Sequence, residues 1–583
     1  MTLRESAFAN GFLAGVHCLA WALIFPCYWF LDRLISVCIP TTKERMHRRE
    51  QACYLVPLKV IFGSLVFSFL FLLTSPIALI GFLLWVPLQL KRRPFVYFHK
   101  CSTSEDESLK KKTDDQAIQA SFGFLTANLC LLPDCLARFN NLSDTQRRSS
   151  VIGQYIVQGV TRPRIKIYVD SPSSGTLSHG SKNSLLTPSH TSGGCTDSQS
   201  PGRPPLPPDS HVAIEDDNTC LVCENENPLN TGPEDVAIAV SDNFKEQDHR
   251  TDEAETVSDK NSNQNSNVFG RFSHKLKGGD VPFEISAHFP ASVDFICLQE
   301  VFDKRAAKKL KEHLSPVFNH VLYDVGIYGF HYCSSFKFFN SGIFFASRHP
   351  ILDATYHCFP NGRGEDALAA KGLLCVKVQL EHNYKEKKLI GYFNCTHLHA
   401  PEADGHIRCE QMDMLSKWIN EFQARTLRTN ENVAFDVLCG DFNFDNTSPD
   451  DKSEQNHNLF DDYRDPCRKG PGQEKPQVIG TLLEQPKLYK VDSPEELQRV
   501  LEDENDRKIF LSPPVGLDGS PCHNMNPEAQ WVGRRLDYIL YREKQFTTEV
   551  EEFTFITHLA GLTDHLSVGM RLLVNMNTNT DNP

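Results

Sequence analysis

The chain has 583 residues, of which 40% are hydrophobic, and its formal net charge is −13 at pH 7. This length exceeds what one compact domain usually needs, and the excess of acidic over basic residues between 281 and 575 disfavours a nucleic-acid groove, which is normally basic. The 19 cysteines follow no framework spacing, which argues against a disulfide-stapled secreted scaffold and favours reduced thiols in a protein that faces the cytosol.

Two long apolar runs fill the N-terminal region, residues 1–95. The first run, residues 11–31, contains no Asp, Glu, Lys or Arg and is too long for the apolar part of a signal peptide. The second run, residues 60–90, follows soon after it. Both runs are therefore expected to stay in the mature protein and to hold it on a membrane.

The residues around these runs favour two re-entrant hairpins over two membrane spans. Basic residues stand on both sides of the second run, at Lys43, Arg45, Arg48, Arg49, Arg92 and Arg93. The positive-inside rule places both flanks in the cytosol. Pro26 and Pro76 lie near the middle of the runs, and a helix of residues 60–73 would be about 21 Å long against a hydrocarbon core of about 30 Å. Cys53, between the runs, is a candidate for acylation.

The catalytic part of the chain is expected to be discontinuous. Residues 171–280 are rich in Ser, Pro, Gly, Asn and acidic residues, so they have little apolar surface to bury and are predicted to form a disordered insertion. The rest divides into a juxtamembrane linker, two segments of one catalytic domain and a short tail, at residues 96–118, 119–170 with 281–575, and 576–583.

Strand-like runs alternate with helical patterns in both catalytic segments. Before the insertion, residues 122–132 are predicted to contain a buried strand that ends in an asparagine, and residues 164–169 a half-buried strand. After residue 281, apolar runs such as VDFICLQ, LIGYFNCTH and AFDVLCG are separated by polar helical segments. An α+β fold with buried sheets follows from this alternation.

Polar groups that can carry chemistry stand at the ends of these predicted strands. They are Asn128, Glu300, His397, Asp441, Asn443, Asp537, Asp564 and His565. Carboxylate and amide oxygens suit a hard divalent cation, and an imidazole beside a carboxylate can act as a general base. The set therefore predicts cleavage of a phosphate ester by water at a metal site.

Each of these groups also has an ordinary structural interpretation. Glu300 taken alone could be a solvated strand end, and GDFN alone could be an Asx turn after a strand. Asp537 could pair with Arg534 or Arg535, and His399 in THLHA could be a simple turn residue. The prediction depends on the whole ordered set, because chance explains it poorly.

The ordered motifs resemble the endonuclease/exonuclease/phosphatase superfamily, whose fold is that of DNase I-like enzymes, and within it the neutral sphingomyelinases. The likeness runs from HCLAWALIFPCYW in the first apolar run to EEFTFITHLAGLTDH near the C-terminus and omits little except the acidic loop. It implies a four-layer α/β-sandwich with an N-terminal membrane anchor. It also implies Mg²⁺-dependent hydrolysis of sphingomyelin to ceramide and phosphocholine, with Mn²⁺ as an alternative cofactor.

By this resemblance, the metal site and the base are assigned to four residues. Glu300 binds Mg²⁺, and Asn128 lies in the shell around the metal and the phosphate. His565 takes a proton from the attacking water while Asp564 orients the imidazole. These roles agree with the general chemistry of metal-assisted phosphodiester hydrolysis.

The remaining strand-end groups are assigned to the water and the phosphate. The resemblance implies that Asp441 and Asn443 position the water and stabilise the transition state. It implies further that His397 contacts the phosphate and that Asp537 supports the same network.

The segment GEDALAAKG resembles a family element that switches the site between closed and substrate-ready states. Asp366 and Lys371 are the matching pair. Their spacing of five disfavours a static salt bridge on a helix surface, so a loop that carries both is expected. Lys371 is then predicted to reach the substrate phosphate once Asp366 releases the metal region, and two unrelated loop charges remain the alternative.

The resemblance further implies activation by anionic phospholipids such as phosphatidylserine, and a location on the cytosolic face of Golgi and plasma membranes. Association of copies through the apolar segments, giving a homo-oligomer, is a further expectation. A DNase I-like nuclease, an inositol-phosphate phosphatase and an inactive lipid-binding scaffold are the rival functions. The apolar anchor favours a lipid substrate over the first two, and retention of all the motifs argues against the scaffold. No nucleic-acid partner is expected.

Overall fold

The computed structural model describes residues 3–50, 55–100, 119–162, 281–330, 335–516, 518–522 and 531–576. All of these residues lie within one compact unit. The expected strand at 164–169, the expected disordered insertion, Cys53 and residues 577–583 of the expected tail lie outside the described residues.

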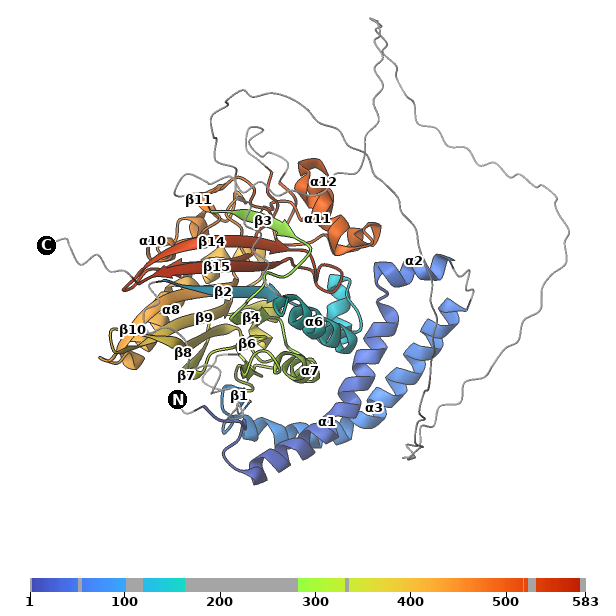
Figure 1. Cartoon of the computed structure of the whole chain (residues 1–583). Coiled ribbons are helices and arrows are strands. Elements are labelled where there is room, and N and C mark those ends of the chain that lie inside the picture. Colours follow the sequence, from blue (N-terminus) through green and yellow to red (C-terminus); the bar gives the residue numbers. More distant parts are fainter. Residues whose placement is uncertain are drawn as a thin grey trace, which may run out of the picture. The chain divides into compact units, whose positions relative to one another are not determined.

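The larger sheet has eight strands in the order β1-β5-β6-β4-β2-β15-β14-β3 (Figure 1). Its strands are β1 (Val96–His99), β2 (Gln119–Asn128), β3 (Phe283–Ser286), β4 (Phe295–Gln299), β5 (His320–Tyr323), β6 (Phe344–Ser347), β14 (Thr547–Ile556) and β15 (Ser567–Asn575). The central strand β2 is parallel to β4 and antiparallel to β15. The ends of β2 and β4 and the beginning of β15 therefore meet at one rim of the sheet.

The smaller sheet has five strands in the order β13-β10-β9-β8-β7. Its strands are β7 (Ile351–Cys358), β8 (Gly372–Tyr384), β9 (Lys387–His397), β10 (Glu431–Asp441) and β13 (Asp537–Arg542). The parallel strands β9 and β10 end together, with Asp441 opposite His397, and the antiparallel β13 begins with Asp537 opposite Asp441. Three polar side chains thus share the rim of this sheet.

The two sheets pack face to face and helices cover their outer faces, which confirms the four-layer α/β-sandwich. Between the sheets, Phe124 and Phe295 stack on Phe393, with ring centroids 5.7 and 5.8 Å apart. Helices α6 (Thr145–Val160) and α7 (Lys304–Leu314) form a second apolar cluster with the eight-stranded sheet. Helix α8 (Gly405–Thr426) forms a third with the five-stranded sheet.

Short elements complete the described part of the chain. They are α2 (Thr42–Glu50), α5 (Asp134–Ala137), α9 (Lys452–Gln455), α10 (Leu459–Asp462), α11 (Pro494–Glu502), α12 (Glu504–Phe510), the strands β11 (Arg468–Gly470) and β12 (Gln473–Glu474), and the 3₁₀ helices η1 (Arg138–Asn140), η2 (Gly364–Leu368), η3 (Glu402–Asp404) and η4 (Gln485–Lys490).

The expected juxtamembrane linker is wrong at its beginning. Residues 96–99, which were assigned to it, form β1 and pair with β5 at the edge of the eight-stranded sheet. The catalytic sandwich therefore takes its first strand from the N-terminal side of the linker. This strand joins the sheet directly after the second apolar run, so the anchor and the sandwich are covalently close.

The two apolar runs form the helices α1 (Gly11–Cys38) and α3 (Val56–Gln89). The expected break at each proline is wrong, because both helices continue through Pro26 and Pro76. The hydroxyls of Thr74 and Ser75 donate to carbonyl groups one turn earlier in α3, at 2.8 and 2.7 Å. Both helices are long and apolar enough to cross a membrane, unlike the 14-residue halves on which the re-entrant prediction depended.

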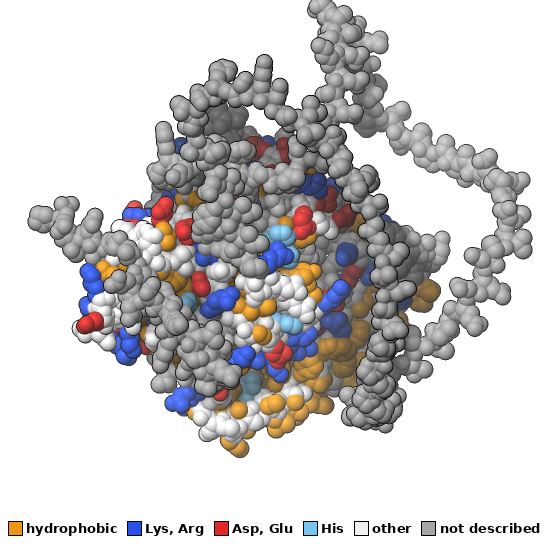
Figure 2. All heavy atoms as spheres, viewed as in Figure 1, with side chains coloured by type: hydrophobic (Ala, Val, Ile, Leu, Met, Phe, Trp, Pro, Cys, Tyr) orange, Lys and Arg blue, Asp and Glu red, His pale blue; other side chains and the backbone are white. Residues whose placement is uncertain are grey.

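Helices α1 and α3 pack on each other and leave apolar side chains on their outer surfaces. Gly81 permits the close approach, since a Cβ atom there would lie 2.7 Å from the carbonyl oxygen of Ala20. Phe69, Leu72 and Leu83 on α3 are between 66% and 68% exposed. Figure 2 shows apolar side chains gathered at the lower right, where Figure 1 places these helices. A water-facing surface of this kind is unusual and marks a membrane contact.

Arg92 joins the end of α3 to the catalytic sandwich. Its guanidinium lies 2.6 Å from the Asp324 carboxylate, donates to the Asp324 and Gly326 carbonyls, and is 3% exposed. Burial would raise the pKa of Asp324, but Arg92 and Lys304 hold the pKa of this carboxyl well below its usual value. The Arg92 side chain is therefore buried in contacts within the protein and is not available to bind lipid head groups. Arg45 on α2, in contrast, is exposed.

Candidate active site

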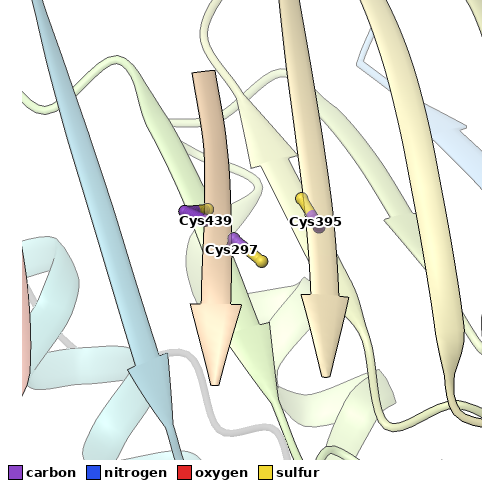
Figure 3. A group of neighbouring side chains, drawn as sticks. All are labelled: Cys297, Cys395 and Cys439. Atoms are coloured by element: carbon purple, nitrogen blue, oxygen red, sulfur yellow. The ribbon is translucent and has the colours of Figure 1, made fainter. Parts of the chain in front are cut away.

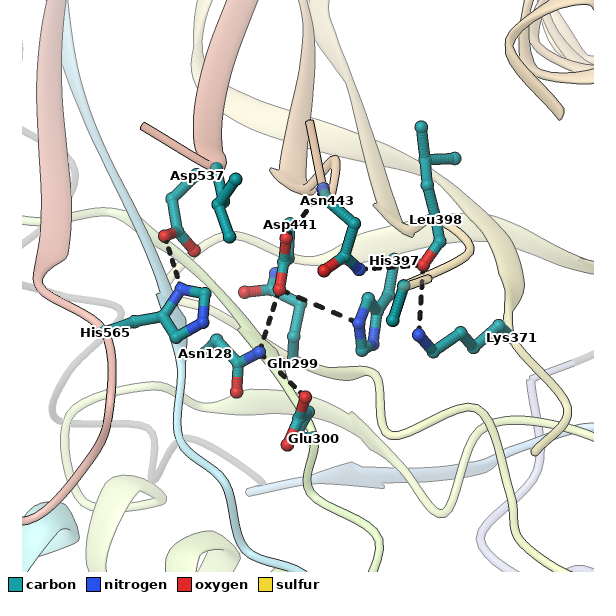
Figure 4. Close-up of polar contacts among 12 residues, drawn as sticks. Asn128, Gln299, Glu300, Lys371, His397, Leu398, Asp441, Asn443, Asp537 and His565 are labelled. Atoms are coloured by element: carbon teal, nitrogen blue, oxygen red, sulfur yellow. Dashed lines mark hydrogen bonds and ion pairs between the residues drawn. The ribbon is translucent and has the colours of Figure 1, made fainter. Parts of the chain in front are cut away.

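The structure brings the strand-end groups of both sheets to one rim of the sandwich (Figure 4). Asn128 and Glu300 come from the ends of β2 and β4, and His397 and Asp441 from the ends of β9 and β10. His565 precedes β15. Residues that are hundreds of positions apart in the sequence thus face one another, as the ordered motifs predict.

Asn128 joins the two carboxylates on which a metal site would depend. Its amide nitrogen donates to Glu300 Oε1 at 3.0 Å and to Asp441 Oδ2 at 2.9 Å. Its amide oxygen accepts from the backbone N–H of Cys130 at 3.1 Å. In this arrangement Asn128 acts as a hydrogen-bond donor between two acids and not as an oxygen ligand.

The environment of Glu300 fits a divalent cation. Glu300 has a left-handed backbone, with φ of 57°, and its Oε2 atom is buried without a hydrogen-bond partner among the described residues. Burial, followed by the charge of Asp564, raises its pKa to about 7, and burial also raises the pKa of Asp441. The half-buried Glu300 and the buried Asp441 lie near each other and are stabilised by a positive charge, and oxygen donors of this kind suit Mg²⁺ or Mn²⁺. Glu300, His397 and Asp441 offer ligand atoms within 4.8 Å of one another.

The imidazole of His565 is oriented by Asp537. The Nδ1 atom of His565 lies 2.7 Å from Asp537 Oδ2, and both side chains are buried. The expectation that Asp564 orients the ring is wrong, because the Asp564 carboxylate accepts from the Asn140 amide at 2.7 Å. Asp537 is also not paired with the neighbouring arginines: Arg535 binds Asp465 and Glu474, and Arg534 binds Glu402.

This pair sets the protonation of the candidate base. Burial alone would lower the pKa of His565, but the Asp537 carboxylate raises it to about 10. With Nδ1 directed to Asp537, the opposite edge of the ring faces Asn128 and Asp441 (Figure 4). Without a cation the ring is therefore protonated at neutral pH. A cation bound between them would lower this pKa, and the neutral ring could then take a proton from a group held there.

The GDFN segment depends on the backbone of Gly440. This residue has φ of +149°, and a Cβ atom there would lie 2.0 Å from the Thr396 carbonyl oxygen of β9. The glycine therefore permits close contact with β9 inside β10, and the Asx turn that the sequence allows follows it at Asp441. Asp441 Oδ1 accepts from the Asn443 N–H at 2.9 Å, and the Asn443 amide donates to the Leu398 carbonyl at 2.9 Å. Both side chains are thereby fixed at the rim.

His397 is buried at the same rim as a neutral imidazole. Its Nε2 atom lies 3.7 Å from Asp441 Oδ2, and its Nδ1 atom has no hydrogen-bond partner among the described residues. Burial, together with the charge of Lys371, lowers its pKa well below the usual value. A neutral ring can donate one hydrogen bond to a phosphoryl oxygen without bringing a second charge.

Asp366 and Lys371 form a buried ion pair beside this rim. Asp366 lies on η2 and Lys371 just before β8, and Lys371 Nζ is 2.9 Å from Asp366 Oδ2 and 3.0 Å from the Leu398 carbonyl oxygen. Because Asp366 and Lys371 lie on different elements, they can pair although a spacing of five does not suit a salt bridge along one helix. Burial opposes ionisation of Asp366, but Lys371 holds the pKa of this carboxyl well below its usual value. His399 is more than a turn residue, because its ring bridges Asp366 and Asp404.

Comparisons with known proteins identify the family. Residues 12–91 match the model of the neutral sphingomyelinase N-terminal transmembrane region, and residues 267–565 match the endonuclease/exonuclease/phosphatase family. Sphingomyelin phosphodiesterase 5 of Danio rerio is 53% identical over 588 residues, which cover 99% of each chain. The chain is a member of the neutral sphingomyelinase family.

Further relatives of this neutral sphingomyelinase support the same family assignment. Human sphingomyelin phosphodiesterase 3 is 40% identical over 654 residues and 99% of each chain is covered. Among solved structures, a mutant beta toxin from Staphylococcus aureus with bound magnesium ions matches 48% of this chain and 86% of its own, at 17% identity and a TM-score of 0.31. The match to a transmembrane-region model and the two apolar helices together indicate membrane association.

Sequence reasoning missed the residues that hold the rim in place. Arg148 on α6 is buried and donates to the carbonyls of Leu129, Cys130 and Leu562, at 3.1, 2.7 and 2.7 Å. The Thr563 hydroxyl donates to the Asn128 carbonyl at 2.6 Å. These bonds connect the ends of β2 to the loop before β15. A run such as TQRRSS reads as a solvated helix start, so the sequence carries little signal for this role.

Three thiols of this neutral sphingomyelinase lie just behind the catalytic groups (Figure 3). They belong to Cys297, Cys395 and Cys439 on strands β4, β9 and β10, and each is fully buried. Cys395 and Cys439 stand two residues before His397 and Asp441, so they point to the same side of their strands. Burial raises the pKa of the Cys395 and Cys439 thiols. Burial alone would raise the pKa of the Cys297 thiol too, but interactions with Cys395 and Cys439 lower it to about 5.

Proposed function

We propose that this protein is a Mg²⁺-dependent sphingomyelin phosphodiesterase that releases phosphocholine and leaves ceramide in the membrane. The observation that carries the proposal is the meeting of Glu300, Asn128, Asp441 and the Asp537–His565 pair at one rim, in a chain that is 53% identical to a sphingomyelin phosphodiesterase over its whole length. The apolar helices support a substrate whose phosphate lies at a bilayer surface.

The chemistry follows from the contacts of the rim. Glu300 and Asp441, with Asn128 between them, would hold the cation, which when bound offsets negative charge on the phosphoryl oxygens. His565 takes a proton from water, and Asp537 keeps the imidazole in the orientation that leaves Nε2 free for it. The water attacks phosphorus in line with the ceramide oxygen, the bond between phosphorus and that oxygen breaks, and the oxygen takes a proton from the surrounding water. Asn443 is fixed beside Asp441 and would orient the same water.

The phosphate is the proposed target of His397 and Lys371. His397 is buried, neutral and has an unused ring nitrogen within the described structure, so it can donate to a phosphoryl oxygen. Lys371 would reach the phosphate only after it leaves Asp366, which makes the observed ion pair the closed state of a switch. Lys371→Ala is expected to lower hydrolysis without lowering membrane binding, and normal hydrolysis by this variant would contradict the switch.

The cellular setting is part of the same proposal. Arg45 and Arg49 on α2 are exposed and would attract anionic phospholipids such as phosphatidylserine. The cytosolic faces of Golgi and plasma membranes are the proposed locations. Acylation of Cys53 and formation of a homo-oligomer through the apolar helices are further proposals. Mn²⁺ is expected to replace Mg²⁺, because both cations accept oxygen ligands.

One assay tests the function and its rivals together. The purified full chain is added to sphingomyelin vesicles with and without Mg²⁺ and phosphatidylserine, and phosphocholine release is measured. His565→Ala serves as the catalytic control, and plasmid DNA and an inositol phosphate serve as rival substrates. Metal-dependent release that is lost in His565→Ala is expected. Release that does not need His565, or faster cleavage of DNA, would overturn the proposal.

A further inference from the structure

An apolar pocket lies between the N-terminal helices and the catalytic sandwich. Its volume is about 240 Å³, and its lining includes Trp21 and Phe25 of α1, Phe82 of α3, and Phe302 and Phe339 of the sandwich. An apolar cavity of about 150 Å³ is large enough to stay dry and to bind benzene. Asp303, Lys304 and Arg305 also line this pocket, which we call the chain pocket, but most of its wall is apolar and suited to a hydrocarbon ligand.

The outer wall of the chain pocket belongs to a surface that contacts lipid. Ala78 and Phe82 line the pocket from α3, whereas Leu79 and Leu83 on the same helix are 58% and 66% exposed. The helix thus presents one side to the pocket and another to the surroundings that cover its exposed leucines.

The inner wall of the chain pocket continues into the catalytic rim. Phe302 follows Glu300 by two residues, and the N–H of Val301 between them donates to the Gly342 carbonyl at 2.8 Å. The Phe339 carbonyl accepts from Ala370, the residue before Lys371, at 3.2 Å. Backbone that forms the pocket therefore also positions a candidate metal ligand and the phosphate-binding lysine.

The size of the chain pocket limits what it can hold. Sites for drug-sized ligands measure about 300–1,000 Å³, so this pocket accepts part of one chain and leaves a second chain in the bilayer. Moving a chain from lipid into it gains little from the hydrophobic effect, because lipid tails are already an apolar solvent. The pocket must therefore increase the rate of hydrolysis by positioning the substrate, because a chain held in it keeps the head group of that lipid at the rim.

We propose that the chain pocket receives one hydrocarbon chain of the sphingomyelin substrate and thereby places the phosphodiester at the catalytic rim. This inference rests on the proposed function and adds a substrate-positioning site to it. Aromatic residues of α1, α3 and the sandwich form the site together, so neither part of the molecule contains it alone.

Filling the pocket tests the proposal. Ala78→Trp places a large side chain in it, and Leu79→Trp is the matched control on the exposed side of the same helix. The full-length variants are assayed in mixed micelles on long-chain sphingomyelin and on p-nitrophenylphosphocholine, which has no chain. Ala78→Trp is expected to lower kcat/KM for sphingomyelin about tenfold and to leave the chainless substrate unchanged, because only positioning is lost. Wild-type kcat/KM for sphingomyelin in Ala78→Trp, or an equal loss on both substrates, would overturn it.

Photolabelling gives a readout that needs neither turnover nor a folded pocket variant. Sphingomyelin with a diazirine in one chain is mixed with the wild-type chain in nanodiscs containing a chelator, and adducts are mapped by mass spectrometry. Adducts on Trp21, Phe82 or Phe339 are expected, and phosphatidylcholine with the same probe should label these residues less. Labelling confined to Leu79 and Leu83, or equal labelling by both lipids, contradicts the proposal. A wild-type chain that fails to release phosphocholine would instead overturn the proposed function, whatever the adducts show.

Discussion

The catalytic rim and the N-terminal helices depart from ordinary protein burial in opposite directions. At the rim, carboxylates such as Glu300 and Asp441 are withdrawn from water, and burial raises the pKa of both even though Lys371 and His565 lie near them. On α3, large apolar residues such as Phe69 and Leu83 are exposed. Both departures would cost free energy in a protein that was alone in water.

The contrast indicates which binding partner each of the two regions requires. The carboxylates of the rim outnumber its two cationic groups, Lys371 and His565, so it is completed by a cation and a phosphate. The helices lack apolar cover and have few charges, so they are completed by lipid. Arg92 and its bonds to Asp324 connect the two regions, which allows the membrane to fix the position of the rim.

Glu300→Gln should have the largest effect, lowering activity while raising the melting temperature of the metal-free protein. Loss of the carboxylate is expected to lower kcat about 10⁴-fold, because the cation site loses a charged ligand. Since burial raises the pKa of Glu300 to about 7, its ionised form weakens folding increasingly as the pH rises from 4.5 through 7. The variant should therefore melt at a higher temperature than wild type at pH 8 in a chelator. Glu312→Gln, an exposed site on α7, is the control, and a lower melting temperature for Glu300→Gln would contradict the assignment.

Asp537→Asn tests which acid orients His565. The variant should lose about 10³-fold in kcat, within the range of general-base catalysis. Because Asp537 raises the pKa of His565, its loss should move the acidic limb of the kcat/KM profile to lower pH. Asp564→Asn is the matched control and should lose less, since that carboxylate binds Asn140. An equal loss in both variants would restore Asp564 as the orienting acid.

Arg92→Met should weaken the connection between the helices and the sandwich. Removal of one partner of this buried pair is expected to lower the free energy of unfolding by about 3 kcal/mol, measured by urea in detergent micelles. The depressed pKa of Asp324 gives stability that is present above its usual value near 4 and is lost as the pH falls. Wild type should thus lose more stability in acid than the variant. Arg93→Met, whose guanidinium donates to the Ser6 carbonyl, should show neither effect.

Arg45→Gln with Arg49→Gln should give the smallest effect and should act on the membrane alone. Each exposed basic residue near an anionic leaflet contributes about 1 kcal/mol to the free energy of membrane binding. The double variant should therefore bind phosphatidylserine vesicles about 30-fold less tightly. Binding to neutral vesicles and hydrolysis of p-nitrophenylphosphocholine should not change. Lys487→Gln with Lys508→Gln, which removes two exposed charges away from α2, is the control for net charge. The same loss on neutral vesicles would assign these arginines to the fold.

The strand-end groups could be predicted because their signal is local. Apolar runs that end in Asn128, His397 or Asp441 predict both a strand and its last residue. Neighbouring parallel strands then bring such ends together at one rim of the sheet. Which acid contacts His565 could not be predicted, since Asp564 is adjacent in sequence but points to Asn140. Asp537 reaches the ring only because β13 begins opposite the end of β10.

The continuity of the apolar helices was also hidden from the sequence. A proline removes one backbone hydrogen bond, which predicts a break when the helix is considered alone. In α3, hydroxyls from Thr74 and Ser75 and the packing of α1 at Gly81 stabilise the turns on either side of Pro76. These contacts come from tertiary neighbours and residue geometry that hydropathy does not record.

The three thiols behind the rim have a practical consequence. An alkylating reagent in solution can meet Cys297, Cys395 or Cys439 only when the two sheets separate, because all three are fully buried. Their labelling rate therefore measures how often the sandwich opens beneath the catalytic groups. A ligand that bridges both sheets should slow this labelling, so the protein contains its own reporter of occupancy.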